Sequence, residues 1–325
     1  MALGAAGGDA VLGSVGRKRL CFALSGEDGR LRPGTIRTYP AQTATGVTAA
    51  LIGYQRDLAL PSLPARSAIA VAGLVRGDAI AITQSRWFVS RSGLHAMLGA
   101  PPLILNDFAA EAWGLCTTAL SVQEVFGGAA APTLQAPGTY LVLGITSGLG
   151  VAVVHRSAAG AVTVLATEAG HGAFAAVDDD LTALAADLSA GRRPVSAEEV
   201  ISAPGLVAIY ALLARRAGTK TPLATPEDVT RAVASNPVAR AACEMLAKAF
   251  WAQAGSLAMT FGAWGGVLVI GGLANAIRPS LRLPGAQALF SASTRYRRVL
   301  GEVPRALVTL ENGELIGVAE ALRHG

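Results

Sequence analysis

The sequence contains few cysteines, few aromatic residues and little charge, and each shortage narrows the class of protein. Cys21, Cys116 and Cys243 lie far apart without metal-ligand spacing, and three is an odd number for a disulfide framework. We therefore expect reduced, buried thiols in a cytoplasmic protein. Charged residues make up 15% of the 325 residues, whereas apolar residues make up 52% and glycines number 38. This composition excludes a disordered chain and favours an α/β protein with buried parallel strands.

Positive charge is present but not concentrated. The chain has 27 basic and 22 acidic residues, a formal net charge of +5, and its densest basic groups are residues 17–19, 192–193 and 295–298. None of these groups is a long basic run with interleaved aromatic residues, the pattern typical of nucleic-acid binding. Scattered lysine and arginine usually form a solvated face, so we expect no nucleic-acid partner.

No hydrophobic run predicts a membrane span. Residues 252–277 carry no charged side chain and would be long enough to cross a bilayer. However, Gly262 and the glycine pairs at 265–266 and 271–272 interrupt this stretch, and residues 267–270 form a run typical of a strand. We expect a buried helix followed by a buried strand, and no membrane partner. Residues 1–14 also lack the basic segment that opens a signal peptide.

Two predicted strand–turn–strand units resemble each other. One covers residues 10–24 around a turn at 16–18, and the other covers residues 140–155 around a loop at 145–150. Two such units facing each other across a cleft would form a clamp for nucleotide phosphates, because no Cβ keeps phosphate away from the backbone at glycine. Glycine turns also simply close hairpins, so this hypothesis needs further support.

The rest of the chain predicts alternating strands and helices. Further strands are expected at 34–39, 68–72, 79–83, 103–105, 162–167, 267–270 and 306–310, with a hairpin turn at Gly77-Asp78. Helices are expected at 46–58, 90–98, from 108 onward and at 314–323, and helical periodicity dominates from 176 to 260. A chain of 325 residues exceeds what one core usually holds, which predicts two domains.

The pair Asn106-Asp107 follows the apolar run 102–105 and precedes a helix-like segment at 108–113. A short apolar run before a helix predicts a buried strand, and a carboxylate at the tip of such a strand lies where α/β folds bind ligands. Aspartate also caps helix N-termini, because its oxygen accepts unpaired backbone N–H groups. The pair by itself is compatible with both interpretations, and the polar residues downstream decide between them.

Two further polar groups lie after a strand and at a helix start. Glu168 and His171 could be a metal pair, a sugar-binding pair or unrelated surface residues. A metal site needs at least three ligands, and no third ligand stands at a suitable spacing. Ser196 and Glu199 match a capping box, which explains Glu199 and leaves Glu198 without a structural role.

Five motifs therefore stand in a fixed order. They are Leu105-Asn106-Asp107-Phe108, Gly144-x-x-Ser147-Gly148-Leu149-Gly150, Glu168-x-x-His171, Glu198 before Ser202-x-Pro204-Gly205-Leu206, and Gly265-Gly266-Val267 with Gly271-Gly272. With them the chain resembles the bacterial glucokinase family of the hexokinase–actin-like ATPase superfamily, from residue 68 to the C-terminus and more loosely from residue 10. The resemblance implies a two-domain α/β fold on ribonuclease-H-like sheets, with glucose and ATP in the interdomain cleft. It also implies a small domain of residues 1–110 completed by a C-terminal helix at 312–325, a large domain of residues 111–311, and a homodimer.

The same resemblance assigns a role to each motif. Asp107 resembles the catalytic base that takes the proton from the sugar 6-hydroxyl, in a reaction of glycolysis that forms glucose 6-phosphate from glucose and ATP. The residues implied to bind the sugar are Asn106, Glu168, His171 and Glu198. The residues implied to bind the nucleotide are Gly16, Arg17 and Lys18 in a first phosphate loop, Ser147, Gly148 and Gly150 in a second, and Gly271 and Gly272 in an adenosine turn. Mg²⁺ is implied as the companion of ATP, with no residue of this chain assigned as its ligand.

The first phosphate loop departs from the family pattern Gly-Asp-x-Gly-Gly-Thr-Asn, since residues 13–19 read Gly-Ser-Val-Gly-Arg-Lys-Arg. Ser14 lacks the carboxylate expected to act through Mg²⁺ and its waters, Arg17 puts a long side chain where backbone should approach phosphate, and Lys18 replaces a phosphate-binding threonine. Either Arg17 and Lys18 neutralise phosphate as cations, or the loop cannot host Mg-ATP and catalysis is lost or very slow. Smaller departures from the family pattern are Leu74, Gln84, Thr146 and Ser147.

Three functions remain open at this point. The first is an ATP-dependent hexose kinase with glucose as acceptor, motivated by Asp107 and the intact sugar-binding set. The second is a catalytically impaired sugar-binding or regulatory protein, motivated by the same set beside an altered phosphate loop. The third is a kinase for another sugar or another phosphoryl donor, since one fold serves many functions. Phosphoryl transfer depends mostly on positioning and charge neutralisation, so the chemistry of the loop separates these hypotheses.

Overall fold

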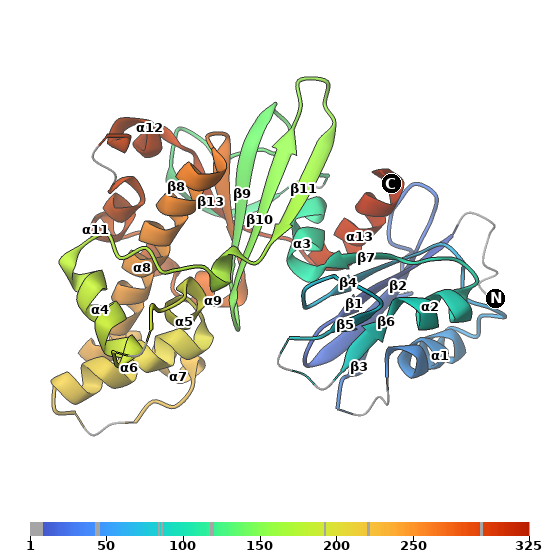
Figure 1. The fold of residues 1–325 in the computed structure, drawn as a ribbon, viewed down its shortest axis with the longest axis horizontal. Coiled ribbons are helices and arrows are strands. Elements are labelled where there is room, and N and C mark those ends of the chain that lie inside the picture. The colour runs from blue at the N-terminus through green and yellow to red at the C-terminus, as the bar shows by residue number, and fades with distance from the viewer. Residues whose placement is uncertain are drawn as a thin grey trace. The chain divides into compact units, whose positions relative to one another are not determined.

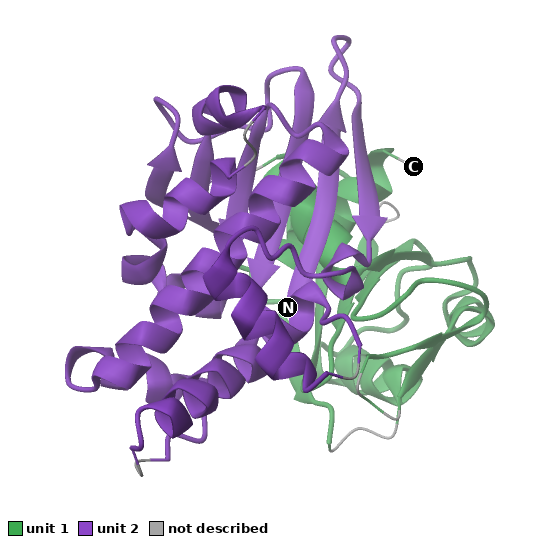
Figure 2. Cartoon of the chain, turned by 60° about the vertical axis from the view of Figure 1, so that its left-hand side comes forward, with its two compact units in different colours: residues 1–119, 310–325 green, residues 120–309 purple. Residues whose placement is uncertain are grey.

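The chain forms two compact units, each with its own β-sheet and helices. The computed structural model describes residues 9–42, 46–83, 85, 87–117, 120–191, 193–219, 222–292 and 295–324. Unit 1 comprises Met1–Ala119 and Leu310–Gly325, and unit 2 comprises Leu120–Thr309 (Figure 2). The α/β class expected from the sequence is therefore confirmed. The expected domain limits, 1–110 with 312–325 and 111–311, stay a prediction.

Unit 1, green in Figure 2, contains a five-stranded sheet in the order β3-β2-β1-β4-β7. These strands are β1 (Ala10–Val15), β2 (Arg19–Ser25), β3 (Arg37–Pro40), β4 (Ser67–Val71) and β7 (Leu103–Asn106). β1, β4 and β7 run parallel to one another, whereas β2 and β3 continue from β1 as an antiparallel meander. A short antiparallel ribbon lies outside this sheet and consists of β5 (Ala79–Ala81) and β6 (Phe88–Ser90).

Helices cover both faces of this sheet, as Figure 1 shows. They are α1 (Val47–Asp57), α2 (Arg91–Leu98), α3 (Asp107–Leu115) and α13 (Gly313–His324). Val15 of β1 shares an apolar core with α1 and α2, whereas Leu12 shares a second core with α3 and α13. Successive side chains of a strand point to opposite faces, so Ser14 lies on the same face as Leu12.

Glycines let α3 and α13 pack closely against each other. A Cβ at Gly317 would lie 1.6 Å from the carbonyl oxygen of Ala110, and a Cβ at Gly114 would lie 2.7 Å from the carbonyl oxygen of Gly313. Neither glycine can therefore carry a side chain unless the two helices separate. This contact places the start of α13 beside the second half of α3, between Glu111 and Gly114.

Unit 2, purple in Figure 2, contains a six-stranded sheet in the order β11-β10-β9-β12-β13-β8. Its strands are β8 (Ser121–Gly127), β9 (Gly138–Ile145), β10 (Leu149–Arg156), β11 (Val162–Thr167), β12 (Gly266–Ile270) and β13 (Arg305–Thr309). β9, β10 and β11 form an antiparallel meander, and β9, β12 and β13 run parallel. Each unit thus contains a hairpin beside parallel strands, which confirms the two similar strand–turn–strand units predicted from the sequence.

The helices of unit 2 surround α8 (Pro237–Phe261), whose long apolar segment is buried. Trp251 on α8 donates its indole N–H to the Leu281 carbonyl at 3.0 Å and packs edge-on against Phe250 and Phe290. α8 ends at Phe261 and β12 follows, so the prediction of a buried helix and strand over residues 252–277 is confirmed. In the described part of the chain no helix is long and apolar enough to span a membrane. The helices are α4 (Asp179–Ser189), α5 (Ala197–Val200), α6 (Ala203–Arg216), α7 (Pro226–Arg231), α8 (Pro237–Phe261), α9 (Gly272–Ala276), α10 (Arg278–Leu281), α11 (Pro284–Gln287) and α12 (Arg297–Glu302), with 3₁₀ turns η1 (Ala169–His171), η2 (Ala232–Ala234) and η3 (Ala288–Ser291).

Three expectations from the sequence need correction. Strand β8 was not predicted, because it is an edge strand with only one buried side chain and no apolar run. The turn at Gly77-Asp78 does not pair its flanking strands, since β4 pairs with β1 and β7 while β5 pairs with β6. All three cysteines are free, as expected, but Cys21 is only half-buried, whereas Cys116 and Cys243 are buried.

Candidate functional site

The polar residues predicted for unit 1 gather at one edge of its sheet. Val15, Val71 and Asn106 lie in register at the carboxyl ends of the parallel strands β1, β4 and β7. The Ala72 N–H donates to the Val15 carbonyl at 3.1 Å, and the Asn106 side-chain amide donates to the Gly73 carbonyl at 3.2 Å. The carboxyl ends of parallel strands are where α/β sheets bind ligands, so this edge is the candidate site of unit 1.

Asn106, and not Asp107, caps helix α3. The Asn106 Oδ1 accepts the N–H groups of Phe108 and Ala109 at 3.0 and 3.1 Å. Asp107 is the first residue of the helix, is half-buried, and accepts the Phe108 N–H through Oδ1 at 2.9 Å. Helix capping by this pair is therefore confirmed, with Asn106 as the N-cap and Asp107 as the first residue of the helix.

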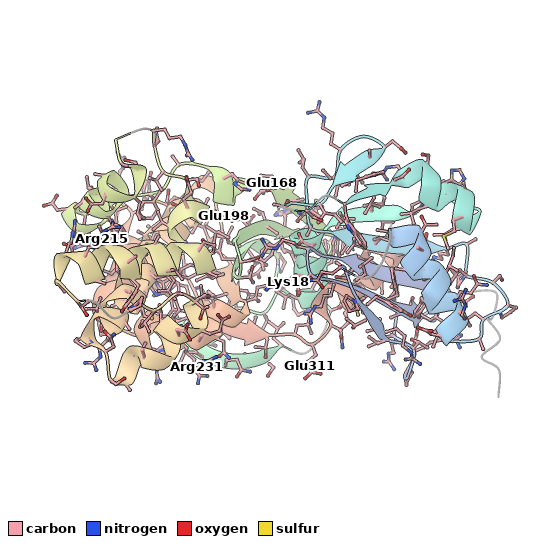
Figure 3. The ribbon with its side chains drawn as sticks, turned by 90° about the horizontal axis from the view of Figure 1, so that it is seen from below. Lys18, Glu168, Glu198, Arg215, Arg231 and Glu311 are labelled. Carbon is pink, nitrogen blue, oxygen red and sulfur yellow. The ribbon has the colours of Figure 1, made fainter. Side chains whose placement is uncertain are left out.

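The first predicted phosphate loop is a tight turn between β1 and β2. The Gly16 N–H donates to the Arg19 carbonyl at 3.0 Å, and the Lys18 carbonyl accepts the Ala41 N–H at 2.9 Å. Lys18, labelled in Figure 3, and Arg19 are exposed, and Arg17 is half-buried. These hydrogen bonds close the turn and tie it to Ala41, and three consecutive side chains, at residues 17–19, bring positive charge to it.

Acidic side chains lie beside this turn, on the face covered by α3 and α13. The Ser14 hydroxyl donates to the Glu314 carboxylate, and Glu111 places its carboxylate against the backbone at the start of α13. Burial first, and then the charges of Glu314 and Asp107, raise the pKa of Glu111 to about 8. Burial also raises the pKa of Glu314, and the Ser14 hydrogen bond and the charge of Arg19 oppose that shift. Unit 1 therefore combines a cationic turn with a set of carboxylates.

The second predicted phosphate loop joins β9 and β10 in unit 2. The Thr146 N–H donates to the Gly148 carbonyl at 2.9 Å, which makes a tight turn with Ser147 exposed at its tip. Gly150 pairs with Gly144 at the base of this turn. The hydroxyl and the small residues of the sequence motif thus lie at the end of a rigid hairpin.

The predicted adenosine turn touches this loop. Gly271 follows directly on β12 with φ +108°, and a Cβ there would lie 2.4 Å from the Ile145 carbonyl oxygen. Gly272 opens α9, and a Cβ there would meet nothing within 4 Å. Because β9 and β12 are parallel neighbours, the loop and the turn lie at the same edge of the sheet. Only glycine allows the contact at position 271.

Glu198 has a structural contact that its sequence position did not reveal. Its Oε2 accepts the Leu149 N–H at 3.0 Å, and a Cβ at Gly148 would lie 2.3 Å from the same oxygen. The capping box of Ser196 and Glu199 is present as predicted and fixes the start of α5. Glu198 therefore connects α5 to the loop between β9 and β10.

Glu168 and His171 lie beside the same loop. The His171 Nε2 is 3.8 Å from the Glu168 Oε2, and their side chains are 56% and 45% exposed. Gly170 between them is buried, and a Cβ there would lie 2.2 Å from the Leu149 carbonyl oxygen. Figure 3 shows Glu168 and Glu198 on neighbouring segments of unit 2. The exposed Glu168 carboxylate, the His171 imidazole and the half-buried Glu198 carboxylate thus lie beside this loop.

The structure sorts the predicted residues into one group in each unit. Gln84 lies outside the described residues, and the described residues hold no group of three or more acidic, histidine or cysteine side chains that could bind a metal by themselves. The sequence missed Glu111 and Glu314, although Glu111 stands one helical turn after Asp107. Unit 1 holds Asn106, Asp107, Gly16, Arg17 and Lys18, and unit 2 holds Glu168, His171, Glu198, Ser147, Gly148, Gly150, Gly271 and Gly272.

Comparison with known sequences agrees with this arrangement. The sequence model of the Glucokinase family matches residues 11–325. A glucokinase from Paramagnetospirillum magneticum is 32% identical over 314 residues, which cover 95% of this chain and 96% of that relative. The chain belongs to the glucokinase family.

Solved glucokinase structures share the fold of this family member. The glucokinase from Balamuthia mandrillaris in complex with glucose aligns with a TM-score of 0.82 at 18% identity, over 98% of this chain and 94% of that one. A ROK family glucokinase from Streptomyces griseus, in complex with glucose and AMPPNP, aligns with a TM-score of 0.63 at 17% identity, over 98% and 100% of the two chains. These alignments confirm the predicted hexokinase–actin-like α/β fold.

The close approach of Gly271 to the Ile145 carbonyl can be tested by substitution. Gly271→Ala should lower the free energy of unfolding by roughly 2 kcal/mol or more, because the new Cβ meets the Ile145 carbonyl and φ is unfavourable for alanine. Gly272→Ala is the matched control and should change it by less than about 1 kcal/mol, since the space there is open. Urea unfolding measures both, and equal midpoints for the two variants would contradict the close approach.

Proposed function

We propose that this chain is an ATP-dependent hexose kinase that transfers the γ-phosphoryl group of ATP to the 6-hydroxyl of glucose. The family match over residues 11–325 and the glucokinase relative support this proposal. The observation that carries it is the place of Asp107 at the carboxyl end of β7, with the cap of α3 supplied by Asn106. A carboxylate thus stands at a ligand-binding sheet edge, and the N-cap of α3 is supplied by its neighbour.

In this proposal Asp107 acts as the catalytic base. Its carboxylate orients the sugar 6-hydroxyl and takes the proton as the hydroxyl oxygen bonds to the γ-phosphorus. The bond from the γ-phosphorus to the β–γ bridging oxygen breaks, and ADP leaves with that electron pair. Asn106 is held by α3 and by Gly73, and its amide keeps a second N–H that can donate to a sugar hydroxyl.

We assign the remaining sugar hydroxyls to Glu168, His171 and Glu198 of unit 2. Each sugar hydroxyl is both a donor and an acceptor, and carboxylates accept such hydrogen bonds well. A site built in this way rejects an analogue that lacks a hydroxyl, because its own polar groups are then left unpaired. The exposed Glu168–His171 pair and the loop-bound Glu198 supply these groups within one unit.

Nucleotide-binding roles are proposed for residues within each unit. Ser147, Gly148, Gly150, Gly271 and Gly272 of unit 2 would hold its phosphates and adenosine, and Arg17 and Lys18 of unit 1 would neutralise phosphate charge as cations. Mg²⁺ fits the oxygen chemistry of unit 1, where the Asp107 and Glu314 carboxylates could hold the ion or its waters. Bound with ATP, this ion would neutralise charge on the phosphates.

A coupled assay with glucose and Mg-ATP tests the proposal directly. The wild-type protein should form glucose 6-phosphate, and parallel assays with hexose epimers and other nucleoside triphosphates identify the preferred sugar and donor. Calorimetry with glucose completes the test. Glucose binding without formation of glucose 6-phosphate would contradict the kinase proposal and would support the alternative of a sugar-binding protein.

The contact of Glu198 predicts an effect on both substrates. Glu198→Ala should raise KM for glucose and KM for ATP by about tenfold or more, because it removes a sugar acceptor and the partner of the Leu149 N–H. His171→Ala should raise KM for glucose only, and Glu198→Gln should leave KM for ATP near the wild-type value because its amide oxygen still accepts the Leu149 N–H. Steady-state kinetics with each substrate varied measure these values. An unchanged KM for ATP in Glu198→Ala would show that the contact does not serve the nucleotide.

We also propose that the protein is a cytoplasmic homodimer that acts in glycolysis. The three free cysteines support a reducing compartment. The resemblance to bacterial glucokinases supports the dimer. Light scattering after size-exclusion chromatography measures the mass, and a value equal to a single chain would contradict the dimer.

A further inference from the structure

Glu314, in the first turn of α13, reaches the strand that leads into the first phosphate loop. The Ser14 hydroxyl donates to its carboxylate, although the two residues are 300 positions apart in the sequence. The charge of Arg19, at the start of β2 on the other side of the turn, also acts on Glu314. A carboxylate from the end of the chain therefore lies beside the cationic turn at residues 16–18.

The packing of α13 fixes this position. Asn312 adopts the left-handed conformation with φ +54°, and α13 begins at the next residue. Four residues further on, Gly317 lies so close to Ala110 of α3 that a Cβ would overlap the Ala110 carbonyl. The helix cannot slide along its neighbour without a clash, so Glu314 is held next to Ser14.

A site for Mg-ATP needs a carboxylate near the phosphates. In kinase sites Mg²⁺ keeps several waters and is held by one or two carboxylates together with the substrate phosphates. The lack of a ready-made metal cage among the described residues is compatible with such a site. Position 14 on β1 offers only a hydroxyl, and the carboxylate that this hydroxyl contacts belongs to Glu314.

We infer that Glu314 replaces the carboxylate missing at position 14 and orders the waters of the Mg²⁺ ion that accompanies ATP. This inference rests on the proposed kinase function. Ser14 is then a positioning residue, since its hydroxyl orients the Glu314 carboxylate. A carboxylate has about four acceptor positions, so the Ser14 hydrogen bond leaves others for metal-bound water.

A purely structural tie between α13 and β1 is the competing role of Glu314. Glutamine separates the two roles, because its carbonyl oxygen still accepts from the Ser14 hydroxyl while the negative charge is removed. A second variant, Ser14→Asp combined with Glu314→Gln, moves the carboxylate from α13 to β1. Glu311, labelled in Figure 3, is an exposed carboxylate just before α13, and Glu311→Gln is the matched control.

Calorimetry with ATP in the presence of Mg²⁺ and in the presence of EDTA tests the inference. The wild-type protein should bind Mg-ATP more tightly than metal-free ATP. Glu314→Gln should reduce this Mg²⁺-dependent gain by about tenfold or more, the double variant should recover most of it, and Glu311→Gln should keep it. Thermal unfolding of each variant checks that the fold is retained.

The outcomes separate this inference from the proposed function. An undiminished Mg²⁺-dependent gain in Glu314→Gln overturns the inference, and so does a wild-type protein without any gain. Glucose 6-phosphate formation is measured on the same samples. If the wild-type protein forms glucose 6-phosphate and Glu314→Gln keeps the full Mg²⁺-dependent gain in ATP affinity, only the inference is overturned. If the gain depends on Glu314 but the wild-type protein forms no glucose 6-phosphate, the inference is supported and the kinase proposal is overturned.

Discussion

Asp107→Asn is expected to lower kcat/KM for glucose phosphorylation by about a thousandfold, because an amide cannot take the proton of the sugar hydroxyl. The fold should be retained, since Asn106 supplies the cap of α3 and the substitution removes no cap. The lost interaction between the Asp107 charge and the helix N-terminus is worth only about 0.3–1 kcal/mol. Glucose 6-phosphate formation and urea unfolding measure the two effects on one preparation.

Two further variants separate catalysis from helix capping. Asp178 caps α4 through the Leu181 N–H at 2.8 Å, and Asp178→Asn should keep both stability and activity because asparagine caps equally well. Asn106→Ala should lower the free energy of unfolding by about 1–2 kcal/mol through loss of the cap. If Asp107→Asn kept a large share of the wild-type activity, another group would have to accept the proton.

The sequence predicted where strands and helices lie along the chain better than it predicted which strands pair with each other. The uncharged stretch 252–277 was assigned to a buried helix and a strand because glycines and β-branched residues mark the change of element. The edge strand β8 carries no such signal, because an exposed strand needs no apolar alternation. The pairing of β5 with β6 depends on packing against the rest of unit 1, which a local turn signal at Gly77 does not contain.

In the candidate site, too, the local motifs could be predicted from the sequence and the long-range contacts could not. Motifs within a few residues of each other, such as Asn106-Asp107 and Ser147–Gly150, were recognisable because local spacing places them at the ends of strands. The contact of Glu198 with Leu149 and that of Glu314 with Ser14 join residues 49 and 300 positions apart. Such contacts follow from helix packing, for which a single sequence gives no local signal.

The free energy of unfolding is expected to fall as the pH rises, and Glu111→Gln is expected to remove much of that fall. Burial first, and then the charges of Glu314 and Asp107, raise the pKa of Glu111 from its ordinary 4.5 to about 8. Between these values the folded protein holds a proton that the unfolded chain has released, so rising pH favours unfolding. The stabilisation from this proton is complete below the lower pKa and is lost as the pH passes the upper one. At about 1.4 kcal/mol per pH unit, it amounts to roughly 4–5 kcal/mol.

Urea unfolding of the wild type and Glu111→Gln at about pH 5, 7 and 8.5 checks this expectation. The two proteins should be similarly stable at the lowest pH, where Glu111 is neutral, and the variant should be more stable at the highest, where the wild type must bury a charge. Glu311 is exposed, so Glu311→Gln should keep the wild-type dependence of the free energy of unfolding on pH. If the free energy of unfolding depended on pH in the same way in the wild type and in Glu111→Gln, Glu111 would ionise between α3 and α13 without a cost in stability. A Glu111 that keeps its proton at neutral pH instead adds no third negative charge beside Asp107 and Glu314, the two carboxylates that the proposed reaction uses.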